Sequence, residues 1–408
     1  MKRRGRFKAR LTRVSLMVAL ATLLPTFALA DSRDQAKRLH DRIAGVPPDE
    51  TTLTAMAAEI DSNRKIDAAL MATDAPEFHS VTLKNFAAPW TNRDRSVFVP
   101  LNDYIATVIG IVRDERDFRE ILYGDIIYVG TGTTNGYRLN DNDHYEELEA
   151  TGADLSNQTT FRMQSQSSVT GLPSQATAGV MTTRAAAKAF FIDGTNRAMF
   201  RFTMLNHLCN DMEQVLDITR SPDRIRQDVS RSPGGDSRVF LNNCIGCHSG
   251  MDPMAQAFAY YDYEYDVATD PDGESGAIHY NDVGTTDPAT GTRVESKYFN
   301  NANNFAYGFA TPDDAWSNYW RAGQNSLLGW DTLLTGSGSG AKTMGQELAN
   351  SDAFAQCQVK KVFTNVCLRP PQDAADRAQI NNMVGSLKTG GYNLKQTFAE
   401  SAVYCMGD

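Results

Sequence analysis

Histidine and cysteine are scarce in this sequence, each occurring six times in 408 residues. A zinc site is built from Cys and His pairs at close spacing, and only one such cluster is present, Cys244-Ile245-Gly246-Cys247-His248. The remaining four cysteines stand alone in the sequence: Cys209, Cys357, Cys367 and Cys405. The absence of a second close pair therefore argues against a structural zinc centre.

Signatures of several enzyme classes are also missing. The sequence contains no P-loop, no Gly-x-Gly-x-x-Gly fingerprint, no defensible Ser-His-Asp arrangement and no paired-carboxylate signature. After Leu29 it contains no uninterrupted apolar run of about 18 residues, the length that a membrane-spanning helix requires. We therefore predict no transmembrane segment in the chain after residue 30.

The N-terminus has the pattern of a secretory signal peptide. Seven basic and no acidic residues precede Val14, and an apolar run then ends at Ala28-Leu29-Ala30, a small-x-small cleavage site. The run is short and contains Pro25, which argues against a membrane span. We predict cleavage before Asp31 by the general secretory route, with the mature protein in the periplasm or outside the cell. Arg3-Arg4 suggests twin-arginine export, but the residues that follow fit that signal poorly.

Acidic side chains outnumber basic ones, with 49 against 40 and a net charge of −9. Removing the signal peptide increases this imbalance, because 40 basic residues less the seven in it leave 33 against 49 acidic ones, a net charge of −16. This excess argues against nucleic acid and against an anionic membrane surface as partners. It is compatible with a positively charged redox partner protein, and equally with simple solubility.

The cluster from Cys244 to His248 has the form of a covalent c-type haem attachment site. Cys244 and Cys247 are spaced to form thioether bonds to the haem vinyl groups, and His248 is placed to bind the iron as the proximal ligand. The pentapeptide occurs once, so we expect one haem c. A thioredoxin-like redox pair is the alternative, but it requires a βαβ context. This motif instead lies between a Ser/Pro/Gly-rich loop over 230–237 and a predicted turn over 250–253.

The four other cysteines are expected to form disulfides, because an exported protein reaches an oxidising compartment. Cys357 and Cys367 lie ten residues apart on one predicted helix, which separates them by about 15 Å, too far for a bridge. Each must pair with Cys209 or Cys405, or stay free. We favour Cys209–Cys357 and Cys367–Cys405, since the second bridge would staple one C-terminal helical unit. The alternative is that one pair does not form.

Apolar residues recur at helical spacing, for example at Leu101, Tyr104, Ile105 and Val108. We predict a mainly α-helical fold, in which a cytochrome c-like haem region is flanked by a helical N-terminal part and a C-terminal three-helix unit. The predicted helices cover 32–44, 49–73, 101–112, a segment beginning near Thr195, 345–368, 373–388 and 394–405. The predicted domains are a signal peptide over 1–30, an N-terminal helical region with a loop-rich connection over 31–177, a c-type haem domain over 178–335 and a C-terminal helical domain over 341–408. A flexible joint is predicted over 335–340.

The order of these features resembles one group of proteins. Leu208-Cys209, a loop, and then Cys244-x-x-Cys247-His248-x-x-Met251-Asp252-Pro253 followed by aromatic residues is similar to the haem domain of planctomycete-type c-type cytochromes. Those are exported proteins built from consecutive domains of unknown function. The run 113–122 resembles their preceding domain, and 354–359 with the helices after it is similar to their C-terminal domain. The chain departs from their usual pattern at Met254 and at 367–369. The resemblance implies a haem and export, and leaves the reaction open.

The second axial ligand of the iron decides between electron transfer and chemistry at an open position. Three residues are candidates: Met344, in a predicted loop before a helix; His279, in a Gly/Asp-rich loop; and His207, on the helix before the motif. An open or water-occupied position is the fourth possibility. For each residue the alternative is an ordinary surface or core side chain.

Other side chains carry weaker predictions. Arg197 and Arg201, one helical turn apart, are candidate partners of the haem propionates, with a solvated helix face as the alternative. The aromatic cluster after the motif could pack on the porphyrin, with strand or core packing as the alternative: Phe258, Tyr260, Tyr261, Tyr263 and Tyr265. Trp316, Trp320 and Trp330 could form an electron path or a platform that stacks on sugar, again with core packing as the alternative. Three histidines beside polar neighbours are predicted to lie on the surface: His40, His79 and His144.

From these features we predict an exported monohaem c-type cytochrome that passes single electrons through the His248-ligated iron to a redox partner protein. Such a carrier needs no catalytic residue of its own. The alternative is a haem peroxidase- or oxygenase-like enzyme with an open distal position. A third class is a polysaccharide-associated or cell-surface binding protein in which the haem is mainly structural.

Overall fold

The structure is a computed structural model that describes residues 31–225, 238, 240–298 and 309–407. The predicted signal peptide over 1–30 and the predicted loop over 230–237 lie outside these residues. Within the described ranges, no helix is both long enough and apolar enough to cross a membrane.

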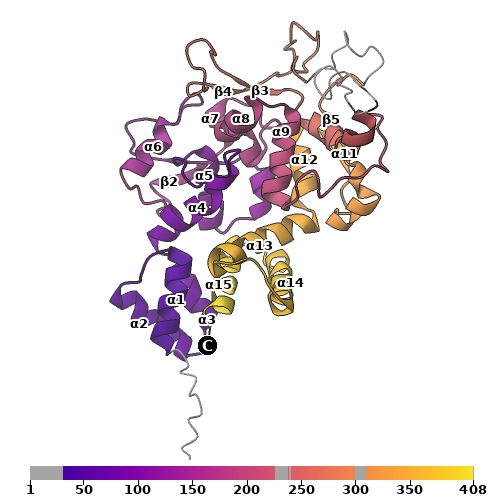
Figure 1. The fold of residues 1–408 in the computed structure, drawn as a ribbon. Coiled ribbons are helices and arrows are strands. Elements are labelled where there is room, and N and C mark those ends of the chain that lie inside the picture. The colour runs from indigo at the N-terminus through magenta and orange to yellow at the C-terminus, as the bar shows by residue number, and fades with distance from the viewer. Residues whose placement is uncertain (1–30, 226–237, 239, 299–308, 408) are drawn as a thin grey trace, which may run out of the picture.

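The fold is mainly α-helical, as predicted (Figure 1). The α-helices are α1 Ser32–Ala44, α2 Glu50–Asp61, α3 Lys65–Ala72, α4 Lys84–Ala87, α5 Asp103–Arg113, α6 Asp143–Ala150, α7 Gln166–Thr170, α8 Arg184–Phe191, α9 Asn196–Thr203, α11 Ile245–Ala255, α12 Gly340–Ala349, α13 Asp352–Cys367, α14 Ala374–Thr389 and α15 Leu394–Cys405. Shorter π-helical turns are η1 Phe78–Leu83, η5 Met204–Leu208 and η6 Phe240–Cys244, and 3-10 turns are η2 Ala88–Trp90, η3 Phe118–Leu122, η4 Gly179–Thr182, η7 Gln256–Phe258, η8 Tyr319–Arg321 and η9 Gln324–Leu328.

The described strands form three separate antiparallel pairs. They are β1 Ile127–Gly130 with β2 Phe161–Gln164, β3 Tyr261–Glu264 with β4 Ala277–Tyr280, and β5 Ala315–Ser317 with β6 Ser337–Ser339. Tyr261 lies opposite Tyr280 in the second pair, and Trp316 opposite Gly338 in the third. Two-stranded ribbons are marginal on their own, so helix packing must provide most of the stability.

The two ends of the described chain pack together in the lower part of Figure 1. Helices α1 and α3 contact α15, and α1 also contacts α13. Two arginines of α1 reach the ends of these C-terminal helices, with Arg38 Nη1 donating to Met406 O at 3.0 Å and Arg42 Nη1 to Val366 O at 3.3 Å. The predicted C-terminal three-helix unit, α13 to α15, is therefore joined to the start of the chain.

The upper part of Figure 1 is built around α5. Every residue of α5 is buried, and the helix packs on α8, β1 and η4. Helix α9 follows α8 and contacts both α11 and η5, while η5 packs on α13. A continuous cluster of buried apolar side chains runs from Ala36 to Met406 through both parts. The domain boundaries given above remain predictions.

Two predicted helices are each divided in the structure. The segment 49–73 breaks between α2 and α3, where Asn63 has a positive φ of 58°. The segment 345–368 breaks at Ser351, whose hydroxyl accepts from Phe354 N at 3.1 Å and caps α13. Serine is a preferred cap because its side chain satisfies a free backbone N–H of the first turn. The flexible joint predicted over 335–340 is wrong in part, because Ser337–Ser339 pairs with β5.

Both favoured disulfides are present. Cys209 pairs with Cys357 with their Cα atoms 5.3 Å apart, and Cys367 pairs with Cys405 at 5.5 Å. The first bridge spans 148 residues and the second 38. Helix α13 contributes one cysteine to each, so it is cross-linked to η5 near its middle and to α15 at its end.

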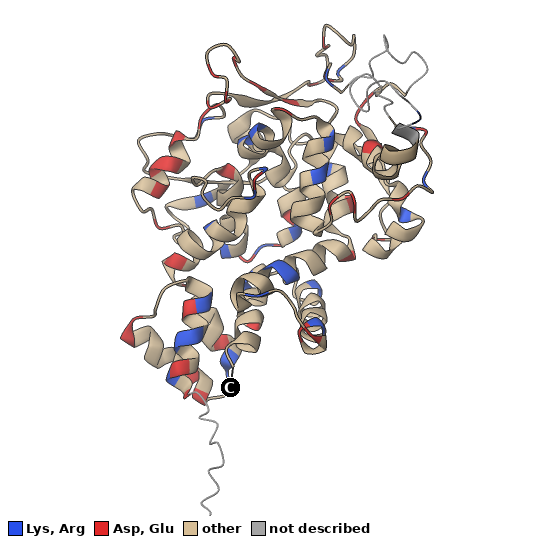
Figure 2. Cartoon of the chain, in the orientation of Figure 1, with Lys and Arg blue, Asp and Glu red and all other residues tan. Residues whose placement is uncertain are grey.

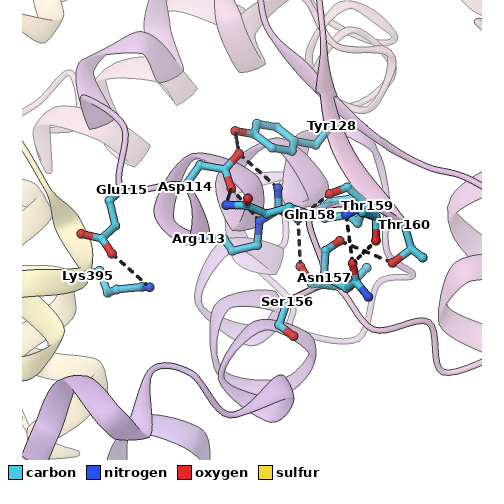
Figure 3. Close-up of polar contacts among 12 residues, drawn as sticks. Arg113, Asp114, Glu115, Tyr128, Ser156, Asn157, Gln158, Thr159, Thr160 and Lys395 are labelled. Atoms are coloured by element: carbon cyan, nitrogen blue, oxygen red, sulfur yellow. Dashed lines mark hydrogen bonds and ion pairs between the residues drawn. The ribbon is translucent and has the colours of Figure 1, made fainter.

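A buried arginine at the end of α5 holds an irregular loop in place (Figure 3). Arg113 Nε donates to Asp114 at 2.8 Å, and its Nη1 donates to the backbone oxygen of Phe161. The guanidinium lies 5.5 Å from the Tyr128 ring centroid and 5.3 Å from that of Phe161. Tyr128 Oη and Gln158 Nε2 also donate to Asp114, at 2.6 and 3.0 Å. One ion pair therefore connects α5, β1 and the loop before β2.

Replacing Arg113 by methionine should lower the free energy of unfolding by about 3–5 kcal/mol, because Asp114 would remain partly buried without its cation. Lysine should not restore the loss fully, since it lacks the planar fork that reaches several acceptors. Urea denaturation measures the change. Arg162→Met, at an exposed position of β2, should change stability by no more than about 0.5 kcal/mol. An Arg113→Met variant as stable as this control would contradict the structural role.

Candidate haem attachment site

The predicted haem motif lies at the start of α11. Cys244 ends η6 and α11 begins at Ile245, so Cys247 and His248 fall in the first turn of the helix. The turn predicted over 250–253 is wrong, because α11 continues to Ala255 with Pro253 inside it. Residues four apart lie on one face of a helix. The continuation therefore places Asp252 beside His248.

Cys244 and Cys247 are the two cysteines without a disulfide, and both are half-buried. The Cys247 thiol donates to Met212 O at 3.6 Å, and burial together with the charge of Glu213 raises its pKa. A π-helical turn rather than a strand precedes the pair, and the described strands are all antiparallel. Neither the raised pKa of Cys247 nor this context favours a thioredoxin-like redox centre.

Apolar side chains border the motif. Asp217 N donates to Gly246 O at 2.9 Å, and this bond holds the segment around Asp217 against the start of α11. A Cβ on Gly246 would lie 2.7 Å from Leu216 Cγ and 3.2 Å from Ile218 Cγ2, so these two side chains lie directly against the start of α11. Leu216 and Ile218 are nevertheless 40% and 70% exposed. Exposed apolar surface beside two unpaired thiols is what the edge of a porphyrin would cover.

His248 is held by a buried ion pair. Its Nδ1 lies 2.9 Å from Asp252 Oδ1, and the same oxygen accepts from Arg197 Nε at 2.8 Å. Arg197 Nη2 donates to the second oxygen at 2.9 Å, which makes the contact bidentate. The side chain of Asp252 is only 3% exposed. Burial opposes its ionisation, but the charges of Arg197 and His248 and the bonds they donate hold the pKa of this carboxyl well below its ordinary value.

This ion pair selects one form of the histidine ring. A carboxylate that accepts from Nδ1–H keeps the proton on that nitrogen and leaves the lone pair on Nε2, the arrangement that a metal-binding imidazole requires. Helix α9 holds α11, and with it this carboxylate–histidine contact, in place. Thr195 caps α9 by accepting from Arg197 N, and Asn196 Nδ2 donates to Ala255 O at 3.0 Å. The first turn of α9 therefore holds α11 at two points.

The role of Asp252 was not identified from the sequence. In the sequence, only its position four residues after His248 points to a contact between the two. That contact requires a helix, whereas the sequence pattern over 250–253 predicts a turn. Arg197, 55 residues away in the chain, was a candidate partner of the haem propionates with a solvated helix face as the alternative, and in the structure it binds Asp252. Arg201 likewise forms a pair with Asp211 at 2.6 Å. Both arginines therefore already have carboxylate partners within the protein.

His207 is part of the protein core. It is 1% exposed, its Nε2 lies 2.7 Å from Tyr104 Oη, and its ring packs edge-on against Trp90. Burial, with the nearby charge of Lys361, lowers the pKa of His207 well below its ordinary value. A role as a second iron ligand would require Nδ1, because Tyr104 already contacts Nε2. Core packing is the simpler account of this residue.

The other two candidate axial ligands also have structural roles. Met344 is fully buried inside α12, so the loop predicted around it is wrong. His279 lies on β4 with both ring nitrogens engaged, Nε2 at 3.0 Å from Asn281 Oδ1 and Nδ1 at 3.3 Å from Glu264. Binding of iron by His279 would break one of these contacts. The identity of the second axial ligand stays a prediction.

The three histidines predicted at the surface are buried, which corrects that prediction. His40 is 4% exposed, His79 2% and His144 1%. Each has a backbone partner: His40 Nδ1 lies 2.8 Å from Val46 O, His79 Nδ1 3.3 Å from Ala75 O and His144 Nδ1 2.8 Å from Asn135 O. A polar neighbour in the sequence does not indicate exposure when the backbone supplies an internal acceptor.

Most of the aromatic side chains after the motif are also buried, and Tyr265 is half-buried. Phe258, Tyr261 and Tyr263 are at most 4% exposed. Tyr261 Oη donates to Ala176 O at 2.6 Å. Trp316, Trp320 and Trp330 are at most 9% exposed. These rings pack in the core, so they do not form an exposed platform for sugars.

Comparisons with known proteins identify no relative: the chain matches no protein family, no curated protein and no solved structure. In the described part of the chain, no group of three or more His, Cys, Asp or Glu side chains could hold a metal ion by itself. The residues around α11 do fit a haem that brings its own iron. They offer two unpaired thiols, a histidine with Nδ1 engaged by a carboxylate, and exposed apolar side chains alongside.

The surroundings of His279 generate a pH prediction. Glu295 Oε1 accepts from Asn281 Nδ2 at 2.7 Å and lies 3.9 Å from His279 Nε2. Burial, and then the negative charge of Asp262, raises the pKa of Glu295 from 4.5 to about 7. The folded state therefore holds this proton more tightly than the unfolded chain. Its contribution to stability is present at pH values below 4.5 and is lost as the pH rises to about 7.

Glu295→Gln should accordingly raise the melting temperature at about pH 8 and leave it nearly unchanged at about pH 4. Thermal denaturation of both proteins at the two pH values measures the difference. Glu213→Gln, at an exposed position, is the matched control and should show no such dependence. Equal effects of Glu295→Gln at both pH values would show that the carboxyl does not titrate in this range.

Proposed function

We propose that this protein is an exported monohaem c-type cytochrome that transfers single electrons. The observation that carries the proposal is the arrangement at the start of α11, where two cysteines left out of the disulfides precede a histidine whose Nδ1 is bound by a buried carboxylate. The other four cysteines are all paired. Cys244 and Cys247 are thus the thiols that remain for haem attachment.

Each residue of the site has a defined part in this proposal. Cys244 and Cys247 would form the thioether bonds, and His248 Nε2 would bind the iron, which supplies one-electron redox chemistry when bound. Asp252 orients the imidazole and holds the proton on Nδ1, and Arg197 keeps the carboxylate ionised. Leu216 and Ile218 would exclude water from one edge of the cofactor. No catalytic side chain is required for electron transfer.

The compartment and partner are part of the same proposal. Haem c is attached outside the cytoplasm, and the basic and apolar pattern over 1–30 is typical of an export signal. The two disulfides are consistent with an oxidising compartment, the periplasm or the extracellular space. The net charge of −16 for residues 31–408, derived from 33 basic and 49 acidic residues, favours a redox partner protein with a basic docking surface.

A haem peroxidase- or oxygenase-like enzyme is the second candidate, and one observation favours it. A carboxylate on Nδ1 makes His248 a stronger electron donor, and strong donation by an axial ligand favours cleavage of an oxygen–oxygen bond. The optical spectrum separates the two. A low-spin spectrum unchanged by carbon monoxide or cyanide indicates electron transfer, whereas a high-spin ferric spectrum with a rapid peroxide reaction indicates the enzyme.

Haem attachment can be tested on the precursor produced together with a c-type haem-attachment system. The denatured, purified protein should gain the mass of one haem and keep its colour through acid–acetone extraction. Cys244→Ala with Cys247→Ala should abolish both signals, because no thiol would remain for the vinyl groups. Cys367→Ala with Cys405→Ala, which removes a disulfide instead, should retain the haem. Wild-type protein without the added mass would refute the proposal.

Asp252→Asn should raise the reduction potential of the haem by about 60 mV or more. For a one-electron couple, about 60 mV corresponds to a tenfold change in the ratio of ferric to ferrous binding affinity of the ligand. Tenfold is the lower end of the change in metal affinity when a metal-bound histidine loses its hydrogen-bond partner. An amide oxygen accepts a weaker hydrogen bond from Nδ1–H than a carboxylate does. The imidazole then donates less electron density to the iron, and the ferric state is stabilised less. Asp211→Asn, at the carboxylate that binds Arg201, is the control. Redox titration followed by absorbance gives both values, and an unchanged or lower potential in Asp252→Asn would contradict this role.

A further inference from the structure

An open cavity lies at the surface apart from the motif, between the α4–η2 segment and α13. Its volume is about 310 Å³, and Cys209, at the end of η5, forms part of its wall. The lining includes the apolar side chains of Phe86, Pro89 and Trp90. Phe86 and Trp90 are buried, and their rings pack edge to face with centroids 4.9 Å apart. The apolar side of the cavity is therefore fixed by the core.

The other side of the cavity is basic. Arg95, Lys360 and Lys361 line it, and the two lysines form the basic segment of α13 in Figure 2. Across the described residues, none of the three forms an ion pair with a carboxylate. By contrast, Lys388 on the neighbouring α14 pairs with Asp352. The lining of the cavity thus contains three basic and no acidic side chains, in a chain whose net charge is −9. The charge of Arg95 also acts on Asp211, which lies outside this lining and whose pKa it helps to lower.

Lys361 is the innermost of these cations. Its Nζ lies 3.5 Å from the centroid of the Trp90 ring and donates to Asn206 O. The ring and one carbonyl offset part of the cost of removing an ammonium group from water, but neither carries a full negative charge. Burial and the like charge of Arg95 lower the pKa of Lys361 well below its ordinary value. A bound anion would offset both the burial of the Lys361 ammonium and its repulsion by Arg95, and would therefore raise the pKa of Lys361 again.

We propose that this cavity binds a small organic monoanion with a flat apolar body, of the aromatic carboxylate class. The carboxylate would accept hydrogen bonds from Lys361 and Arg95, which are charge-assisted and therefore strong. The ring would lie against the apolar wall that Phe86, Pro89 and Trp90 form. A volume of about 310 Å³ lies at the small end of the range for ligand pockets, which suits a single ring.

The cavity connects to the haem attachment site through a short segment. Cys209 belongs to its wall, and Met212, three residues further along, accepts from the Cys247 thiol at 3.6 Å. A bound ring would therefore lie at one end of this segment and the haem thiols at the other. Binding of the anion itself requires only the cavity, so it does not depend on the presence of haem.

Isothermal titration of the mature chain with sodium benzoate tests the proposal. Benzoate should bind saturably at one site, while benzyl alcohol, which keeps the ring but not the charge, and acetate, which keeps the charge but not the ring, should bind at least tenfold more weakly. Lys361→Met should weaken benzoate binding at least tenfold, and Lys361→Arg should retain most of it. Lys388→Met, remote from the cavity, should bind benzoate as the wild type does.

Arg95→Gln provides a second test that does not disturb the core, because Arg95 lies at an exposed position. It should also weaken benzoate binding, with an unchanged melting temperature. Three results would overturn the proposal: no saturable binding of benzoate, equal affinity for benzyl alcohol, or equal affinity of wild type, Lys361→Met and Arg95→Gln. If Lys361→Met does not fold, Arg95→Gln and the three probes on the wild type decide the question.

Discussion

The buried carboxylate of Asp252 is the group on which the candidate haem site depends. Removing such a charge from water is costly, and the cost is offset only because Arg197 and His248 bind it from two sides. Arg197 lies on α9 and His248 on α11, so a single carboxylate fixes both the packing of two helices and the orientation of the imidazole. Loss of Arg197 would leave an unbalanced charge inside the protein, and loss of His248 would remove one hydrogen bond to the carboxylate, so the same group serves both the packing and the candidate site.

Hydrogen bonds and a disulfide join the two ends of the described chain. Arg38 and Arg42 of α1 donate to the last carbonyls of the C-terminal helices, where the helix dipole favours a positive charge. The Cys367–Cys405 bridge closes the same corner covalently. The haem motif lies in the other part of the molecule, and α13 connects the two through its contact with η5. The Cys209–Cys357 bridge reinforces that contact.

Features that depend on neighbouring residues could be predicted from the sequence, and features that depend on distant ones could not. Helix α1 follows from its Asp31 cap and local apolar spacing. The separation of Cys357 and Cys367 along one helix excludes a bridge between those two, and it leaves two cross-pairings with Cys209 and Cys405, of which the structure contains the favoured one. The course of α11 through Pro253 was missed, because its support comes from Asn196, 59 residues away. The burial of histidines such as His144 was missed for the same reason, since their surroundings are assembled only by the fold.

Under the proposed export and haem attachment, the cysteine arrangement constrains the order in which covalent bonds can form. Cys244 and Cys247 are close enough to meet in an unfolded polypeptide, whereas the bridges across 148 and 38 residues need distant segments to come together. Oxidation would therefore form a disulfide between Cys244 and Cys247 first, unless the two thiols react with haem or are kept reduced. If the proposed haem is to attach, the cell must keep this pair reduced until the cofactor arrives, because a disulfide between Cys244 and Cys247 would occupy both thiols that the haem vinyl groups require.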